Sequence, residues 1–172
     1  MSYEKQPDVL PKHTRYEVWS VIIEGATAVG YFTHAWRPEF KEFAPTEAMR
    51  AELERINAQL TRLAPAILAA PATADVDMRM KDGFECHLKA TETDDSLWIF
   101  AQNMDLGPAG EQKRQFEPIS PRGGEAVISV EGLAAETRVA VVDEDRTVTS
   151  TADGTFSDMF PPLGEHIYRI DK

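Results

Sequence analysis

Titratable and nucleophilic side chains are scattered along this sequence, and they form no recognisable motif. The four histidines are His13, His34, His87 and His166, and Cys86 is the single cysteine. Cys86 and His87 are neighbours on an expected strand, where successive side chains point to opposite faces, so they cannot ligate one metal ion. A buried thiol that packs as a small hydrophobe is the expected state of Cys86. We therefore predict no metal site and no cofactor.

Acidic residues are the other candidates for chemistry. Asp143-Glu144-Asp145 and Asp153-Gly154 could gather oxygens around calcium, but their spacing fits no EF-hand loop, and acidic turns are usually solvated. With 29 Asp and Glu residues in the chain, carboxylate pairs are too common for any one pair to be singled out. The sequence contains no phosphate-binding loop, nucleophile elbow or dinucleotide fingerprint. We expect no complete active site.

The composition of the chain argues against some classes of binding partner. The chain has 172 residues and a formal net charge of -11, which disfavours nucleic acid and anionic lipid because both are bound through gathered Lys and Arg. No stretch approaches the roughly 18 apolar residues that a membrane helix needs. The N-terminal residues lack the apolar region of a secretion signal. We expect no nucleic-acid or membrane partner, and the compartment stays open.

A helix and a short strand are expected in the first third of the chain. Thr14 and Glu17 have the spacing of a capping box, which predicts that a helix begins there, and Gly25 can end it in the left-handed conformation. Residues 28–33 form an apolar run without apolar/polar alternation. Such a run is typical of a strand buried on both faces of a parallel sheet.

A second helix is indicated by Pro45-Thr46-Glu47 and by apolar residues that recur at steps of three and four as far as Ile67. Pro65 should kink or restart this helix near its end, because proline lacks the backbone N–H that bonds one turn back. Residues 69–74 then form a linker. We predict a first domain over residues 1–70 and a second over residues 74–172.

In the second domain the hydrophobic period changes to two, which is typical of β-strands. Asp153-Gly154 is the strongest hairpin signal, because this dipeptide favours a tight turn between two strands. The expected fold class is α+β, mainly β, with an antiparallel β-sandwich of about eight strands preceded by a helix–strand–helix segment. Strands are expected at about residues 75–80, 84–90, 97–103, 112–118, 125–131, 137–142, 146–151, 154–159 and 165–170.

One continuous segment carries a resemblance to a known family. It reads Trp19-Ser-Val-Ile-Ile-Glu-Gly-Ala-Thr-Ala-Val-Gly-Tyr-Phe-Thr-His-Ala-Trp. This run resembles the last helix-to-strand step of a glycoside-hydrolase-like (β/α)8 barrel. Residues 96–103 and 160–170 more loosely resemble the β-sandwich that often closes such enzymes. The resemblance covers residues 14–43 and, less specifically, 74–170.

The resemblance implies what the first domain would be. Residues 28–33 would correspond to the eighth barrel strand and residues 47–69 to the eighth helix. The catalytic carboxylates of such enzymes lie on earlier barrel strands, which this chain does not contain. At the end of the eighth strand the family implies a substrate-binding group, here Thr33, His34 and Trp36. A Trp ring can stack on a sugar while His bonds a hydroxyl.

Other interpretations compete with this one. Trp36 and His34 could be ordinary packing residues at a strand exit, and Glu24 could simply pair with a nearby cation. The preferred hypothesis is an accessory, structural β-sandwich portion of a glycoside-hydrolase-like protein, not active alone. The alternatives are a free-standing module that binds carbohydrate or a protein through Trp98, Trp36 or Tyr31, and a complete small enzyme. Apolar surface left uncovered in the first domain predicts a homo-oligomer formed through the N-terminal segment.

Overall fold

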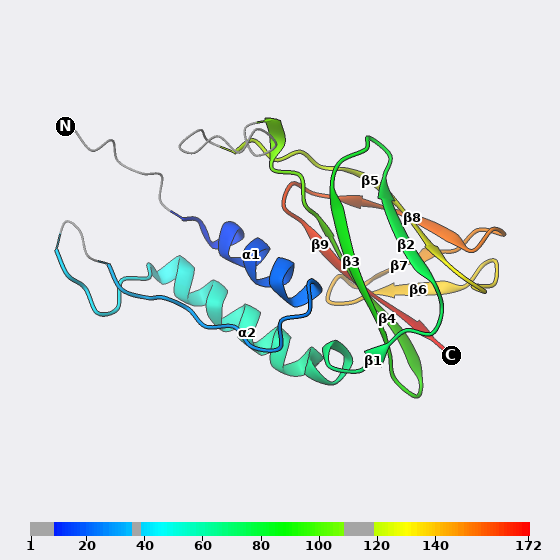
Figure 1. Ribbon diagram of the computed structural model, residues 1–172, viewed down its shortest axis with the longest axis horizontal. Coiled ribbons are helices and arrows are strands. Elements are labelled where there is room, and N and C mark those ends of the chain that lie inside the picture. The colour runs from blue at the N-terminus through cyan, green and yellow to red at the C-terminus, as the bar shows by residue number, and fades with distance from the viewer. Residues whose placement is uncertain (1–8, 36–38, 109–118) are drawn as a thin grey trace.

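The computed structural model describes residues 9–35, 39–108 and 119–172, in which two helices precede nine strands (Figure 1). All strand pairs are antiparallel. The predicted fold class is therefore confirmed, while the strand expected at residues 112–118 lies outside the described residues. The elements are α1 (Pro11–Ile23), α2 (Glu47–Ile67), β1 (Ala70–Pro71), β2 (Val76–Met80), β3 (Cys86–Glu92), β4 (Ser96–Asn103), β5 (Gly124–Val130), β6 (Arg138–Val141), β7 (Arg146–Thr149), β8 (Thr155–Phe160) and β9 (Glu165–Asp171).

The strands form two sheets that enclose one hydrophobic core. The larger sheet has six strands in the order β1-β3-β4-β9-β6-β7, and the smaller has three in the order β2-β5-β8. Apolar side chains from both sheets meet in the core, among them Ile99, Ile128, Phe156 and Tyr168. Alternating burial along β5 is the signature of a strand with one face on this core.

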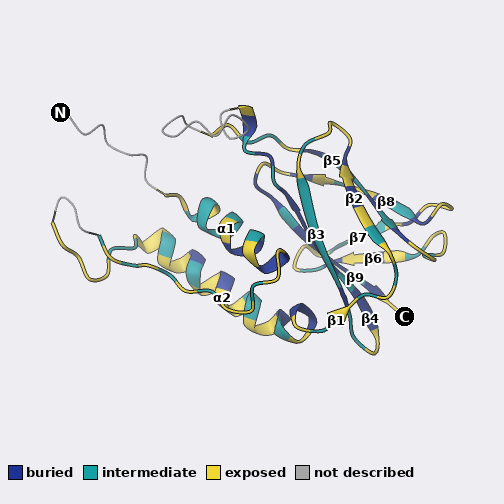
Figure 2. Ribbon diagram, in the orientation of Figure 1, coloured by how far each residue is buried: buried dark blue, intermediate teal, exposed yellow. Residues whose placement is uncertain are grey.

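The centre of the six-stranded sheet is buried on both faces (Figure 2). Along β4, Leu97, Ile99 and Ala101 belong to the sandwich core, whereas Phe100 belongs to a second cluster with the helices. The ring of Trp19 from α1 stacks on Phe100, with 6.1 Å between ring centroids. The molecule thus has three layers, with the helices on the outer face of the larger sheet.

Helix α1 begins three residues before the predicted start. Pro11 occupies its first position, and Nδ1 of His13 accepts a hydrogen bond of 3.3 Å from the backbone N–H that precedes the helix. Proline suits this position because its missing N–H has no intrahelical partner there. The start expected from Thr14 and Glu17 is therefore wrong. The end is confirmed, since Gly25 follows the helix with φ +103°.

Helix α2 begins as predicted, because the Thr46 side chain accepts a hydrogen bond of 3.2 Å from the backbone N–H of Met49. Pro65 does not end the helix, which continues to Ile67. Leu63 and Ile67 are buried in the cluster shared with the sheet. The Thr91 hydroxyl also donates to the carbonyl oxygen of residue 66 at 2.7 Å. Tertiary contacts on both sides of Pro65 therefore hold the last turn in helical form.

The strand expected at residues 28–33 does not form, which corrects the helix–strand–helix prediction. The chain between Gly25 and Ala35 is extended and runs alongside α2 without joining either sheet (Figure 1). Its regular pairing is confined to an isolated bridge between Ala35 and Lys41. A strand of a parallel sheet needs at least one neighbouring strand to pair with, and the described residues supply none for this segment.

The turn at Asp153-Gly154 forms, but the hairpin expected there does not. Gly154 has φ +75°, and the Thr151 N–H donates to Thr155 O at 2.8 Å. However, β7 pairs with β6 in the larger sheet, while β8 pairs with β5 in the smaller one. The turn is therefore a corner at which the chain passes from one sheet to the other.

Candidate functional site

An aromatic cluster lies on the extended segment and on the loop that follows it. The ring of His34 lies between Phe32 and Phe40, with centroid separations of 5.0 and 5.9 Å and interplanar angles of 39° and 33°. Phe32 is 77% exposed and Phe40 is 57% exposed. Large aromatic side chains that stay accessible to water are typical of contact surfaces.

The extended segment has two distinct faces. Val29, Tyr31 and Thr33 are half-buried, whereas Gly30, Phe32 and His34 are exposed. The inner face rests on the helices, and the Tyr31 hydroxyl donates to the Asn57 side chain of α2 at 3.0 Å. This alternation is that of a β-strand lying with one face on a hydrophobic layer.

The backbone of this segment is not satisfied within the described chain. Residues 27–32 make no backbone hydrogen bond to any other described residue. Thr33 contributes only its carbonyl oxygen, which accepts from the Ala44 N–H at 2.9 Å. The segment therefore has the geometry of a strand whose edges are open to another polypeptide.

A cavity of about 240 Å³ lies beneath the start of the extended segment. It is partly open to solvent and is lined by the end of α1, by residues 26–29 and by one face of α2. Most of its lining is apolar, with Asn57 and two threonines as the polar groups. The helical layer is therefore not fully packed next to the unpaired backbone.

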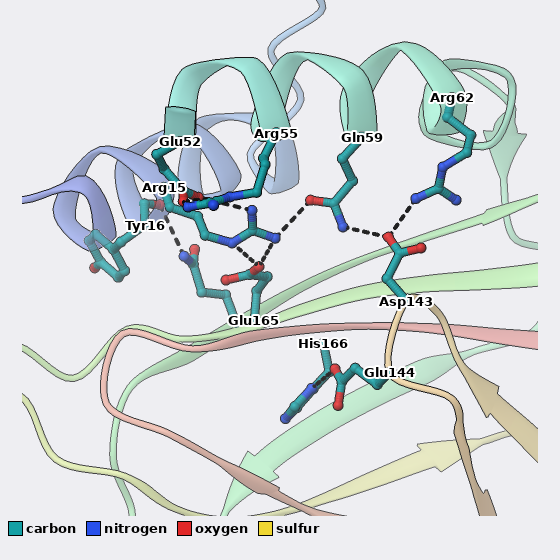
Figure 3. A network of polar contacts seen from close by, with 11 residues as sticks. Arg15, Tyr16, Glu52, Arg55, Gln59, Arg62, Asp143, Glu144, Glu165 and His166 are labelled. Carbon is teal, nitrogen blue, oxygen red and sulfur yellow. Dashed lines mark hydrogen bonds and ion pairs between the residues drawn. The ribbon is translucent and has the colours of Figure 1, made fainter. Parts of the chain in front are cut away.

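The helical layer is held on the sheet by a group of polar contacts centred on Arg15 (Figure 3). Arg15 Nε and Nη2 lie 2.7 and 2.6 Å from Glu165 Oε1 on β9. The same guanidinium contacts Glu52 Oε1 at 3.3 Å and donates to Gln59 Oε1 at 2.7 Å, both on α2. One side chain thus joins α1, α2 and the sheet.

The two carboxylates around Arg15 differ in their pKa values. Burial raises the pKa of the Glu165 carboxyl, and the Arg15 charge only partly opposes the shift. Burial acts in the same direction on Glu52, but hydrogen bonds from Arg55 and Arg15 outweigh it and lower the pKa of Glu52. At Glu165 burial outweighs the opposing effects of Arg15 and His166, whereas at Glu52 the two guanidinium groups outweigh burial.

Further contacts join α2 to the turn between β6 and β7. Gln59 Nε2 donates to Asp143 Oδ2 at 2.8 Å, and Arg62 Nη2 donates to the same oxygen at 2.5 Å. Asp143 belongs to the acidic run that the sequence offered as a calcium site. Among the described residues, no three His, Cys, Asp or Glu side chains gather in a way that could hold a metal ion. The observed partners of Asp143 are a guanidinium and a side-chain amide.

A second polar cluster lies at the edge of the sandwich. His166 is hydrogen-bonded through Nδ1 to Glu144 at 2.5 Å and through Nε2 to the carbonyl oxygen of Met159 at 3.0 Å. Arg146 bridges Glu144 and Asp158, and the Tyr168 hydroxyl donates to Asp158 at 3.0 Å. Burial and the Asp158 charge raise the pKa of Tyr168 far above its usual range. These groups satisfy one another, so they link β6–β7, β8 and β9.

The predicted binding residues are placed differently from one another. His34 is exposed within the aromatic cluster, and Thr33 is half-buried on the opposite face. Trp36 lies outside the described residues. Trp98, suggested as an alternative platform, packs against the helical cluster and lies beneath Arg169, whose guanidinium carbon is 5.7 Å from the ring centroid. Its ring is therefore not free to stack on a ligand.

The remaining candidates make local contacts. Cys86 packs against the sandwich core, where burial raises the pKa of its thiol. His87 contacts the Glu24 carboxylate through Nδ1. The two neighbours thus point to opposite faces, as predicted, and Glu24 pairs with a side chain of the sheet.

Sequence reasoning missed the two features that define this region. Phe32 and Phe40 were not singled out, although two Phe residues flanking a His within nine positions are a detectable aromatic signal. The Arg15–Glu165 contact joins residues 150 positions apart, for which a single sequence carries no signal.

Comparison of the chain with protein-family models, curated proteins and solved structures finds no match. In the part of the chain that the structure describes, no helix has the length and apolar character needed to cross a bilayer.

Proposed function

We propose that this chain is a non-catalytic accessory portion of a larger glycoside-hydrolase-like protein, in which its sandwich supports an adjoining barrel. The observation that supports the proposal is the open backbone of residues 27–32, described above. Two helices flank this segment in sequence, as helices flank each strand of a (β/α)8 barrel. Paired with neighbouring barrel strands, the segment would gain the hydrogen bonds that it lacks here.

The distribution of charge supports docking through the helical layer. Residues 1–70 hold nine acidic and eight basic residues, whereas residues 71–172 hold twenty and ten. Exposed large hydrophobic residues also gather before residue 70, among them Val21, Phe32, Phe43 and Leu68. A nearly neutral surface with exposed apolar side chains is better suited to a buried contact than an acidic one.

The test compares this chain with a longer polypeptide that includes the residues encoded in frame before Met1. Amide hydrogen exchange should be slowed at residues 27–32 in the longer protein relative to this chain, measured at a dilution at which light scattering gives the mass of one chain, because barrel pairing would protect those N–H groups. A stop codon directly before Met1, or equal exchange in both proteins, would contradict the proposal.

A second candidate function is carbohydrate binding by a free-standing module. The cluster of Phe32, His34 and Phe40 favours it, since aromatic rings and a ring nitrogen can contact a sugar's apolar face and its hydroxyls. Calorimetric titration with oligosaccharides identified on a glycan array should then show binding that is lost in Phe32→Ala. Phe43→Ala is the matched control outside the cluster. Absence of binding to any saccharide would count against this function.

A further inference from the structure

We propose that two copies of the isolated chain pair antiparallel through residues 28–34, about a two-fold axis at Tyr31. The inference rests on the docking role proposed above for the extended segment. It states that a second copy of the chain pairs with this segment when no barrel is present. A second copy is the partner that every solution of this chain contains. It would bring the same extended backbone and the same exposed Phe32.

The segment is already shaped for strand pairing. Its backbone is extended, its side chains alternate between the helices and solvent, and residues 27–32 have no backbone partner in the described chain. Antiparallel pairing through exposed edges is the usual way in which such a strand is satisfied. Little rearrangement of the monomer is needed, because the inner face stays on its own helices.

Two-fold symmetry restricts the register. In an antiparallel pair, directly opposite residues point to the same face. A perpendicular two-fold axis then pairs residues of equal parity, so Val29 lies opposite Thr33 on the helical side. Phe32 of each copy lies opposite Gly30 of the other on the outer side. Gly30 has nothing within 4 Å of the position of a Cβ atom, so it leaves room for the Phe32 ring.

Charge favours this surface over the rest of the molecule. Two copies of the acidic sandwich, with ten more acidic than basic residues after position 70, repel each other. The first 70 residues carry an excess of one acidic residue. The segment itself, residues 28–34, contains no Asp, Glu, Lys or Arg. Self-association is therefore least opposed where the unpaired backbone lies.

The first experiment measures mass by light scattering during gel filtration at micromolar concentration. The wild-type chain should have the mass of two chains, and Phe32→Glu should have the mass of one, because the two new carboxylates would be diagonal neighbours on the same face of the paired strands and would repel each other. Phe32 is 77% exposed, so the substitution should leave the circular dichroism spectrum and Tm unchanged. Phe43→Glu adds the same charge on the same layer outside the segment and should stay dimeric.

A monomeric wild-type chain would overturn the inference. So would dissociation by both substitutions, which would assign the contact to the general aromatic surface. If the chain is monomeric while the longer polypeptide still protects residues 27–32 from exchange, the inference fails and the proposed function stands. If the chain is dimeric while residues 27–32 exchange equally in the monomeric chain and in the longer polypeptide, the inference stands and the proposed function fails.

The register has its own test. Tyr31→Cys in a Cys86→Ser background should form a disulfide-linked dimer on mild oxidation, because the two Cβ atoms would face each other across the axis. Val21→Cys in the same background places a thiol on the exposed side of α1 and should not cross-link. Equal cross-linking of both variants, or none at position 31, would contradict the proposed pairing.

Discussion

Arg15 and Glu165 join the first helix to the last strand. Two nitrogens of the guanidinium lie 2.7 and 2.6 Å from one carboxylate oxygen. The side chain of Glu165 is only 11% exposed and that of Arg15 27%. Because α1 and α2 both contact the sheet through this pair and its neighbours, the ion pair positions the helical layer on the sheet.

Removal of Arg15 should loosen the helical layer. Arg15→Ala leaves Glu165 buried without its cation, and we expect the free energy of unfolding to fall by about 2 kcal/mol. Urea denaturation followed by tryptophan fluorescence measures the change. Lys12→Ala, at an exposed site on the same helix, is the control and should change it little. Equal effects of the two substitutions would contradict a positioning role for Arg15.

Glu165 should give stability an unusual pH dependence. Burial raises the pKa of its carboxyl above the ordinary value of 4.5. Between that value and the folded pKa, the native state holds a proton that the unfolded chain releases, so this residue stabilises the fold as pH falls. The difference in unfolding free energy between wild type and Glu165→Gln should therefore shift in favour of wild type from pH 7 towards pH 4.5. A difference that does not change with pH would contradict this prediction.

Asp105 should give the free energy of unfolding a pH dependence opposite in sign to that given by Glu165. Its carboxylate accepts from Arg122 N, Nε and Nη2 at 2.7, 3.0 and 2.5 Å, and these side-chain contacts hold its pKa below the ordinary 3.8. Asp105→Asn should lower the free energy of unfolding by about 2 kcal/mol at neutral pH. The deficit should shrink as pH falls below 3.8, because the unfolded chain takes up a proton there while the folded carboxylate stays ionised down to its lowered pKa. Asp77→Asn, at an exposed position on β2, is the control.

The contact between β3 and the end of α2 depends on one hydroxyl. Thr91 is 1% exposed and donates to the carbonyl oxygen of Ala66 at 2.7 Å. Thr91→Val keeps the volume but leaves that oxygen without its donor, at an expected cost of about 1–2 kcal/mol. Amide exchange in the last turn of α2 should also become faster. Thr147→Val, on the exposed face of β7, should have no such effect.

Local patterns determined most of the secondary structure. The period of two located β3, β4, β5 and β9 to within about two residues, because strand side chains alternate regardless of the partner strand. Thr46 marked the start of α2, since a capping hydroxyl acts within its own turn. The predicted start of α1 at Thr14 was wrong because Pro11 satisfies the requirements of a helix start earlier in the chain.

Little of the candidate site followed from the sequence. His34 was recognised as a candidate, but its aromatic neighbours Phe32 and Phe40 were not. The run at residues 28–33 was correctly identified as extended and apolar, yet the partner strands that it implied are not among the described residues. A hydrophobic pattern reports that burial is favourable without specifying what covers the surface.

The sequence by itself therefore determined where most of the helices and strands form and that the fold is mainly antiparallel β. The tertiary structure decided how strands divide between two sheets, that the Asp153-Gly154 turn is a corner, and which face of the larger sheet the helices cover. These outcomes depend on contacts between residues far apart in the chain, such as Arg15 and Glu165. Hydrogen-bonding capacity and hydrophobicity are encoded residue by residue, whereas the choice of distant partner is settled only when all surfaces are packed together.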